Sequence, residues 1–328
     1  MGIPHIFTAI KTQIILKNNS TMKKLAVSSI SLIFACLLFS CKEKTEGHKH
    51  GPDTHTHIAE SLGNLATNYY GEYQLEDAKF GTKTMVTITA KERIMITNSL
   101  PNHVTGKFPN KGNPNTISEQ NRTFKFPLIP KYTGIAKWII EPGIALNGIK
   151  FQPGTGEVVV CESGENYRIE ALQDVFDLGL DTNHAHVQPS GAYHYHGTPT
   201  AVIEDLDTGE DLIHIGFAHD GFPMYYSKSN AYKPSFKLLG GNREGEDCSY
   251  SNPGQTIALP DVGHHDGTFG SDFEYVDGSG DLDECNGITV DGKYMYLVTN
   301  DFPYVGRCLM GEFVSKERPG PPPGAGQG

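Results

Sequence analysis

Apolar and polar residues alternate over short stretches along much of the chain, which is the pattern of strands that bury one face. Gly and Pro residues separate these stretches every eight to fifteen positions. The pattern predicts a mainly β fold: a single sandwich- or barrel-like domain with one or two short helices and long loops. The alternating stretches are residues 85–89, 93–97, 136–140, 158–161, 212–217 and 294–298.

Residues 165–178 differ from this pattern and are predicted to form a helix. Ile169, Leu172, Val175 and Phe176 recur at helical spacing and would form one apolar stripe. The sequence contains no internal repeat. Its length beyond Leu62 is sufficient for one large domain with a sizeable core.

The amino-terminal part of the chain predicts export and lipid attachment. Residues 1–21 fit an upstream mis-start, and residues 22–41 fit a lipoprotein signal peptide with a basic start, an apolar run and a lipobox-like end at Cys41. We therefore expect Cys41 to be lipidated and to anchor the protein to a membrane of the bacterial cell envelope, at the outer membrane or the cell surface. The alternative is an uncleaved membrane anchor, although the apolar run is shorter than the roughly twenty residues of a membrane span.

Two flanking segments are too polar, or too rich in Pro and Gly, to form a core. Residues 42–61 predict a flexible tether and residues 318–328 a disordered Pro/Gly tail, which leaves residues 62–317 as the domain. The tether carries His48, His50, His55 and His57, which form either a solvated linker or a loose metal-binding tract.

Charge and cysteine content restrict the partners and the compartment. The first forty residues contain four lysines and no acidic residue, so the remainder has 23 basic and 38 acidic residues and a net charge near −15. This balance disfavours nucleic acid as a partner. Four cysteines remain beyond the signal, and an even number in an exported protein predicts two disulfides with three connectivities. We favour Cys285–Cys308, across one hairpin-like segment, which leaves Cys161–Cys248.

The densest group of histidines lies in residues 183–197, where four of the fourteen histidines fall within thirteen positions. Two His-x-His pairs flank a Gln-Pro-Ser-Gly segment, which is typical of a tight turn. Alternate residues of a strand share a face, so a hairpin over this turn would bring the four imidazoles to one patch. Tyr193 and Tyr195 would then point to the opposite face, toward the core. The four histidines are His184, His186, His194 and His196.

Convergent imidazoles predict a site for a divalent transition metal, zinc or copper, because imidazole is the commonest protein ligand for such ions. Three histidines with an open fourth position would activate water or polarise a substrate oxygen, which makes the protein a candidate metal-dependent hydrolase or copper protein. The alternative is a non-catalytic binding module. In that case the histidines, tyrosines and asparagines would bind glycans or other polar extracellular ligands without a metal.

The segment Tyr193-His194-Tyr195-His196 is accompanied by several other ordered motifs. They are Pro101-Asn102-His103 with Thr105-Gly106, Phe108-Pro109-Asn110, Asn113-Pro114-Asn115, Gly216-Phe217-Ala218, Asp220-Gly221-Phe222-Pro223, residues 280–287 and Phe302-Pro303-Tyr304 ahead of Cys308. Together these motifs resemble the YHYH domain family, from about Thr97 to about Gly311. The resemblance implies the identity of the domain and no established reaction. It places His186, His194 and His196 within the matched motif.

Further residues are candidates for the same site. His103 lies in a Pro-Asn-His-x-Thr-Gly loop, and we expect it to join the motif histidines as a metal ligand, since loops on a β scaffold often carry function. The alternative is a loop whose asparagines stabilise turns. His184, His214 and Asp220 are candidates for orienting a ligating histidine through its second ring nitrogen. Asp220-Gly221 is equally typical of an ordinary turn.

A calcium site is a second candidate, because Asp277, Asp281 and Asp283 place carboxylates near one another in one acidic loop. The loop differs from an EF-hand, which has Gly where Leu282 stands, and the alternative is an acidic turn ahead of Cys285. The sequence lacks a nucleophile elbow, a P-loop and a dinucleotide fingerprint. Serine hydrolases, nucleotide-dependent enzymes and flavin or nicotinamide chemistry are therefore disfavoured.

Overall fold

The computed structural model describes residues 67–314. The expectations for residues 1–61, including lipidation at Cys41, and for the tail at residues 318–328 concern parts of the chain outside this range. Strands dominate the described residues, with one α-helix, α1 (Thr200–Leu206), and one 3-10 helix, η1 (Gly270–Asp272). Neither of these helices within residues 67–314 is long and apolar enough to cross a membrane.

The described chain begins with an antiparallel four-stranded sheet in the order β1-β2-β3-β4. Its alternating pattern separates two faces, because Val86, Met95 and Phe126 are buried whereas Met85 and Ile96 are exposed. The strands are β1 (Tyr73–Asp77), β2 (Thr82–Ile88), β3 (Glu92–Thr97) and β4 (Arg122–Pro127).

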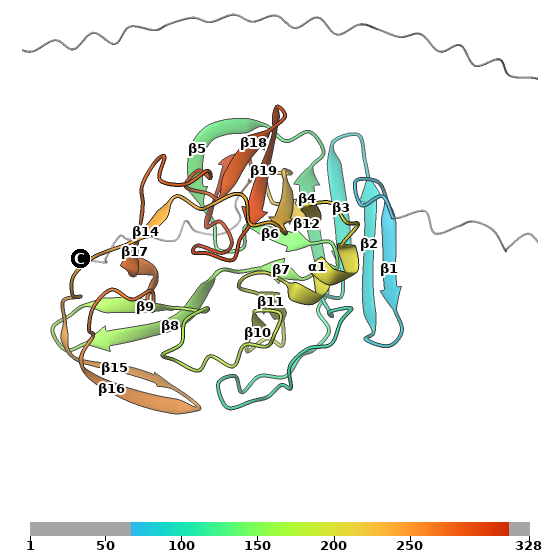
Figure 1. The fold of residues 1–328 in the computed structure, drawn as a ribbon. Helices are drawn as coiled ribbons and strands as arrows, with labels where there is room; N and C mark the ends of the chain where they lie inside the picture. The colour runs from blue at the N-terminus through green and yellow to red at the C-terminus, as the bar shows by residue number, and fades with distance from the viewer. Residues whose placement is uncertain (1–66, 315–328) are drawn as a thin grey trace, which may run out of the picture. The chain divides into compact units, whose positions relative to one another are not determined.

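A mixed eight-stranded sheet lies at the centre of the described unit (Figure 1). Its order is β10-β11-β7-β6-β12-β13-β19-β18, and the β11–β7 and β13–β19 pairs are parallel. The strands are β6 (Gly143–Ala145), β7 (Lys150–Phe151), β10 (Ala185–Val187), β11 (Tyr193–Tyr195), β12 (Leu212–Ala218), β13 (Pro223–Ser227), β18 (Gly287–Val290) and β19 (Lys293–Val298).

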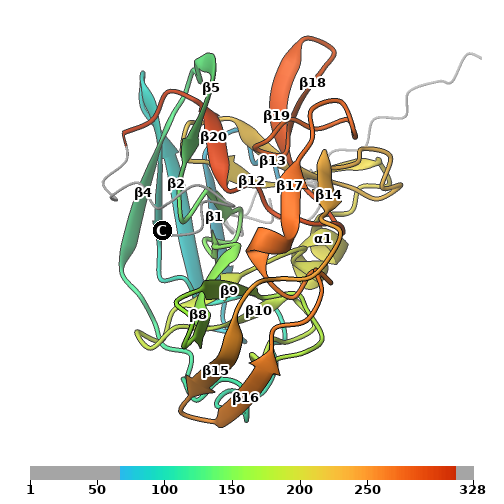
Figure 2. The same ribbon diagram turned by 90° about the vertical axis from the view of Figure 1, so that its left-hand side faces the viewer.

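A third sheet has the order β16-β15-β8-β9, and two further pairs, β14–β17 and β20–β5, complete the strands of the described residues. In both ribbon views β15 and β16 lie at the opposite end from β18 and β19 (Figures 1 and 2). The strands are β5 (Tyr132–Trp138), β8 (Gly154–Cys161), β9 (Asn166–Glu170), β14 (Phe236–Leu238), β15 (Glu246–Asn252), β16 (Gln255–Asp261), β17 (Phe273–Tyr275) and β20 (Cys308–Gly311).

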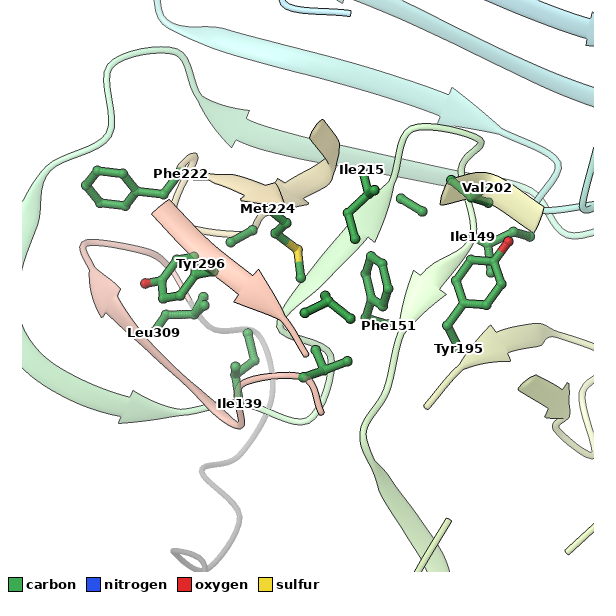
Figure 3. Packing of buried hydrophobic residues seen from close by; sticks show 14 of the residues in the cluster. Ile139, Ile149, Phe151, Tyr195, Val202, Ile215, Phe222, Met224, Tyr296 and Leu309 are labelled. Carbon is green, nitrogen blue, oxygen red and sulfur yellow. The ribbon is translucent and has the colours of Figure 1, made fainter. Parts of the chain in front are cut away.

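The largest group of buried apolar side chains packs on the central sheet (Figure 3). Tyr195 of β11 lies beside Phe151 of β7, with ring centroids 5.6 Å apart, and Val202 brings α1 against the same group. Full burial of an aromatic or branched aliphatic side chain stabilises the fold by about 1.5–3 kcal/mol. The short strands β7 and β11 therefore hold their positions through core packing rather than through their few ladder hydrogen bonds.

The predicted mainly β class is confirmed, in a sandwich-like form. The protein is divided among several sheets, and within residues 67–314 none of them closes on itself. The six stretches that alternate in sequence overlap β2, β3, β5, β8, β12 and β19.

The helix predicted over residues 165–178 is wrong. Residues 166–170 form β9, which pairs with β8, and irregular turns follow it. Pairing with β8 buries Ile169 beside Phe176 without a helix. The Gln173 amide also binds the local backbone, since its Oε1 accepts from the amides of Val175 and Phe176 at 2.7 Å each. These bonds stabilise a turn where a helix would need its own ladder.

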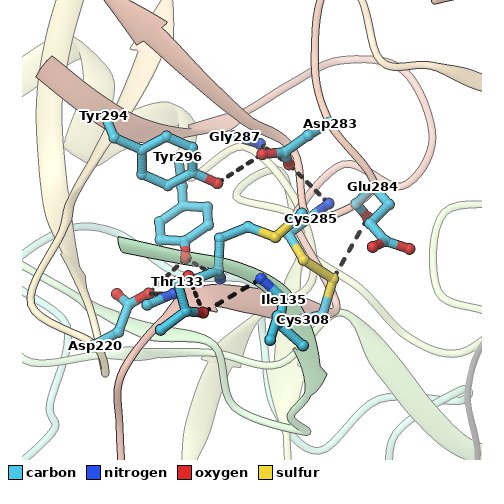
Figure 4. Close-up of a disulfide and its surroundings, with 12 residues drawn as sticks. Thr133, Ile135, Asp220, Asp283, Glu284, Cys285, Gly287, Tyr294, Tyr296 and Cys308 are labelled. Atoms are coloured by element: carbon cyan, nitrogen blue, oxygen red, sulfur yellow. Dashed lines mark hydrogen bonds between the residues drawn. A yellow bond between two sulfur atoms is a disulfide. The ribbon is translucent and has the colours of Figure 1, made fainter. Parts of the chain in front are cut away.

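Both predicted disulfides are present. Cys161–Cys248 joins β8 to β15 across 87 residues, and Cys285–Cys308 closes a 23-residue segment beside the Tyr294 and Tyr296 hydroxyls (Figure 4). In the loop-closure account, links of these lengths stabilise the folded state by about 4.6 and about 3.4 kcal/mol. Structural disulfides indicate folding in an oxidising compartment.

Candidate metal centre

The predicted hairpin is formed by β10 and β11. The strands are antiparallel, and His186 lies directly opposite His194. The turn between them closes with a hydrogen bond from the Gly191 amide to the Gln188 carbonyl at 2.8 Å. Gly191 has a φ of 84°, which glycine adopts without the steric cost that a side chain would add. The Pro-Ser-Gly segment therefore acts as the predicted tight turn.

The two faces of β11 separate its tyrosines from its histidines, as predicted. Tyr193 and Tyr195 are 1% and 0% exposed and belong to the main core. His194 points to the other face, and His196 follows directly after the strand. The His196 amide donates to the His184 carbonyl at 2.8 Å, which extends the hairpin pairing by one step and keeps His196 on the histidine side.

His186, His194 and His196 converge on one point, and we call them the His triad. One nitrogen from each ring lies within 4.8 Å of one from each of the others, and the ring centroids are 4.6–4.8 Å apart. His194 and His196 are only 2% and 1% exposed, whereas His186 is partly exposed. Within residues 67–314, this is the one group of three or more His, Cys, Asp or Glu side chains with ligand-like spacing.

Backbone carbonyls fix the tautomer of each ring in the His triad. The Nδ1 atoms of His186, His194 and His196 face the carbonyl oxygens of Leu178, Ala192 and Pro153 at 2.8, 3.3 and 3.4 Å. A carbonyl can only accept, so each Nδ1 carries the proton and donates it. Each Nε2 then carries a free lone pair, which is the arrangement that metal-binding histidines adopt.

Burial keeps the three rings neutral. Desolvation lowers the pKa of His186, and it lowers the pKa values of His194 and His196 well below the ordinary histidine value. Neighbouring groups lower the pKa values of His194 and His196 further, because each disfavours a positive charge on the ring. The other triad rings and Lys150 act on His194, and His186, Arg307 and Lys150 act on His196. The Nε2 atom of His196 is buried and has no hydrogen-bond partner within the described residues. Three neutral donors with one orphaned nitrogen make a set suited to a transition metal ion.

A pocket of about 370 Å³ adjoins the His triad. All three histidines line it, and the other walls come from the loop at residues 112–115, from β8 and its approach, from Leu178, from the hairpin at residues 187–189, and from the end of β15 with Pro253. The site is therefore a buried ligand set at the wall of a cavity.

Residues 123–311 match the family described as YHYH protein. This chain belongs to the YHYH family. No curated protein and no solved structure matches the chain. The family match contains the hairpin and the pocket residues of β8 and β15, whereas β1, β2 and β3 precede it.

His103 lies on the tyrosine side of the YHYH strand and does not join the His triad. Its Nε2 is 2.7 Å from the Tyr195 hydroxyl, and its Nδ1 is 3.0 Å from the Val104 carbonyl. The loop contacts the hairpin on the face of β11 opposite the His triad. The expected metal ligand is instead a hydrogen-bond partner of a core tyrosine.

The three residues expected to orient ligating histidines have other contacts. His184 has a φ of 51°, which turns it out of the strand, and its Nδ1 is 2.9 Å from the Thr198 carbonyl. His214 bonds the Gly216 carbonyl at 3.0 Å and stacks on Tyr70. Asp220 accepts from the Tyr296 hydroxyl and the Gly311 amide near the Cys285–Cys308 bridge (Figure 4). Burial raises the pKa of Asp220 to about 6. In their place, carbonyl groups orient the triad.

The acidic loop expected to bind calcium does not bring its carboxylates together. Asp283 accepts hydrogen bonds from the Cys285 and Gly287 amides and from the Tyr294 hydroxyl. Asp281 accepts from the Lys233 amide, and Asp277 from the Tyr275 hydroxyl. These contacts support the alternative, an acidic turn ahead of Cys285.

Three asparagines connect distant segments to the hairpin. The Nδ2 atoms of Asn113 and Asn115 both donate to the Val187 carbonyl, at 2.9 and 2.7 Å. On the core side, Asn147 donates to the Tyr195 hydroxyl at 3.0 Å. These bonds tie β10 and β11 to segments far away in sequence, so the asparagines support the geometry of the triad without contributing ligands.

Sequence reasoning missed the pocket residues of β8 and its approach. Gln152 and Glu157 line the same cavity as the His triad. They lie in no motif that was singled out, and they reach the site because β11 pairs in parallel with β7, which leads directly into β8. Such parallel pairing across more than forty residues leaves no local sequence signal.

Proposed function

We propose that this chain is a cell-envelope lipoprotein whose YHYH domain binds one divalent transition metal ion, zinc or copper, through the Nε2 atoms of the His triad. The observation that carries the proposal is the buried, unpartnered Nε2 of His196 in a cluster with two other neutral imidazoles. A buried polar atom without a partner costs about 1–3 kcal/mol. A metal ion would satisfy that atom and both neighbours at once.

The donor set suits both metals. Zinc and copper accept imidazole nitrogen, and tetrahedral nitrogen ligands at 2.0–2.1 Å from zinc would lie about 3.4 Å apart. Ligand atoms that lie within 4.8 Å before binding reach that spacing by small rotations of the rings. Three protein ligands leave a fourth position, and the adjoining pocket provides room for it.

An open position at such a metal supports hydrolysis by a metal-activated water, or copper chemistry, as the reaction class. Glycan binding by the YHYH tyrosines is less well supported. Tyr193 and Tyr195 are buried in the core and offer no face for a sugar to stack on.

The proposed location rests on two features. The two disulfides are typical of an oxidising compartment. The segment that ends at Cys41 has the composition of a lipoprotein signal, so we propose attachment to the membrane by a lipid on that cysteine.

Metal stoichiometry of the purified full-length chain tests the proposal. The chain is loaded with zinc or with copper, desalted and measured by elemental analysis beside His194→Ala, His196→Ala and His264→Ala. His264 is an exposed histidine outside the triad, and the tether histidines are present in all four proteins. We expect each triad variant to lose about one metal ion per chain and His264→Ala to lose none. Equal metal content in all four proteins would refute the proposed site.

A further inference from the structure

The pocket beside the His triad has an unusual distribution of charge. Among residues 67–314, five carboxamide side chains line it, and no lysine or arginine does. Apart from the histidines, Glu157 is the one ionisable residue that this part of the chain contributes. The carboxamides are Asn113, Asn115, Gln152, Gln188 and Asn252.

Glu157 is held in place from the β15 side. The Tyr250 hydroxyl donates to its Oε2 at 3.0 Å, and the side-chain Nδ2 of Asn252 donates to the Tyr250 hydroxyl at 2.6 Å. Oε1 of Glu157 has no protein partner among the described residues. Glu157 lines the same cavity as His186, His194 and His196, so its charge lies close to the ligand set.

Two cations near the triad do not offset this charge. The Lys150 ammonium is paired with Glu141, and the Arg307 guanidinium binds Glu170 through two hydrogen bonds at 2.5 and 2.8 Å. Each cation is therefore paired with a carboxylate of its own, and neither lines the pocket. Glu157 is the one carboxylate among the described residues that line the pocket beside the proposed metal.

The rim also presents matched hydrogen-bonding groups. The side-chain Nε2 of Gln188 donates to Oε1 of Gln152 at 2.8 Å. This bond leaves the Nε2 donor of Gln152 and the Oε1 acceptor of Gln188 for a ligand, whereas Asn113 and Asn115 both use their Nδ2 groups on Val187. A small ligand that carries hydroxyl or amide groups can accept from Nε2 of Gln152 and donate to Oε1 of Gln188.

We infer that the pocket admits a small, uncharged, hydroxyl- or amide-bearing ligand to the open metal position, and that the Glu157 carboxylate disfavours anions there. The inference rests on the proposed metal site and adds the chemical class of the ligand. Phosphate esters and carboxylates are the classes whose affinity the Glu157 carboxylate should lower.

Ligand titrations of the copper(II)-loaded full-length chain test the inference. Azide is the anionic probe and imidazole the neutral one, and the visible absorption of the copper reports binding. A unit charge about 10 Å away in a solvent-open pocket changes the affinity for an anion about two- to fourfold. We expect Glu157→Gln to bind azide about threefold more tightly than the unmodified chain does, with imidazole affinity unchanged. Glu157→Asp, which keeps the charge, and Glu274→Gln, which removes an exposed carboxylate outside the pocket, should leave azide affinity unchanged.

A second measurement compares the same two chains at low and high salt. Added salt should reduce the difference in azide affinity between the Glu157→Gln and unmodified chains, because it screens the carboxylate. Equal azide affinity in the two chains, or a difference that added salt leaves unchanged, would overturn the inference while leaving the metal site intact. A His194→Ala chain that holds as much copper as the unmodified chain would instead refute the proposed function on which the inference rests.

Discussion

Replacement of His196 by leucine should separate the free-energy cost of burying the His triad from the stability that metal binding adds. His196 is 1% exposed, its Nε2 has no partner within the described residues, and its Nδ1 forms only a 3.4 Å bond to the Pro153 carbonyl. An unpaired buried nitrogen costs about 1–3 kcal/mol, and a weak neutral hydrogen bond returns about 0.5–1 kcal/mol. Leucine has a similar size and no polar atom. Without metal, the free energy of unfolding of His196→Leu should therefore equal that of the unmodified chain or exceed it by about 1 kcal/mol.

Metal should reverse this order. At a free metal concentration of about 1,000 times the dissociation constant, binding stabilises the native state by about 4 kcal/mol. The unmodified chain should gain this stability and His196→Leu should gain little of it, because the ligand count falls from three to two. The two proteins would therefore exchange rank on addition of zinc.

Urea denaturation at pH 8 with the disulfides intact measures both free energies. The fluorescence of the single tryptophan, Trp138, reports unfolding, and His264→Leu serves as the exposed-histidine control. At this pH the histidines are neutral in the folded and unfolded states, so protonation does not enter. A metal-free His196→Leu protein that is less stable by more than about 2 kcal/mol, together with no effect of zinc on the unmodified chain, would show that the histidine is structural.

Three further outcomes follow from the same structure. Because burial lowers the pKa of each triad histidine, the unfolded chain binds protons first as the pH falls below about 6.5. The free energy of unfolding of the metal-free chain should therefore be full above that pH and fall below it by about 1.4 kcal/mol per pH unit for each ring still neutral in the folded state. Urea midpoints that do not change from pH 8 to pH 5 would contradict this. Tyr195→Phe removes the hydroxyl that binds His103 and Asn147 and should lower the free energy of unfolding by about 1–3 kcal/mol, with the same metal content as the unmodified chain. Loss of one metal ion per chain would instead show that the tyrosine face carries ligands. Cys41→Ser should leave the chain soluble or unprocessed rather than extracted from membranes with detergent, and unchanged fractionation would count against lipid attachment.

The features predicted correctly from sequence are those that depend on local pattern. Two-residue alternation located six strands, and Pro and Gly between the histidine pairs located the hairpin turn. The disulfide Cys285–Cys308 was favoured because its cysteines are close in sequence, and the other pair followed. The helix over residues 165–178 failed because apolar spacing alone does not distinguish a helix from a strand and turns that bury the same side chains, as Ile169 and Phe176 do here.

The site was predicted only as far as one hairpin defines it. The His triad comes from two short strands and their immediate continuation, so its convergence could be inferred. His103 was expected among the metal ligands, and it lies instead beside Tyr195, because sequence does not show from which side a loop approaches a strand. Glu157 could not be inferred at all, since it enters the pocket through the path from β7 into β8.

The alternation of Tyr and His in β11 has a consequence for how such a site keeps its geometry. Side chains alternate faces with a period of two, so a shift of one residue in the pairing of β11 would exchange the histidines with the tyrosines. Tyr195 is packed against Phe151 and hydrogen-bonded to His103 and Asn147, and Asn113 and Asn115 fix β10 at Val187. A slipped register would bury two imidazoles in the core and remove both tyrosine rings from it, at a cost of several kcal/mol for each aromatic lost. The tyrosines therefore set the register, and the register is what holds three neutral imidazoles together in a buried position before any metal binds.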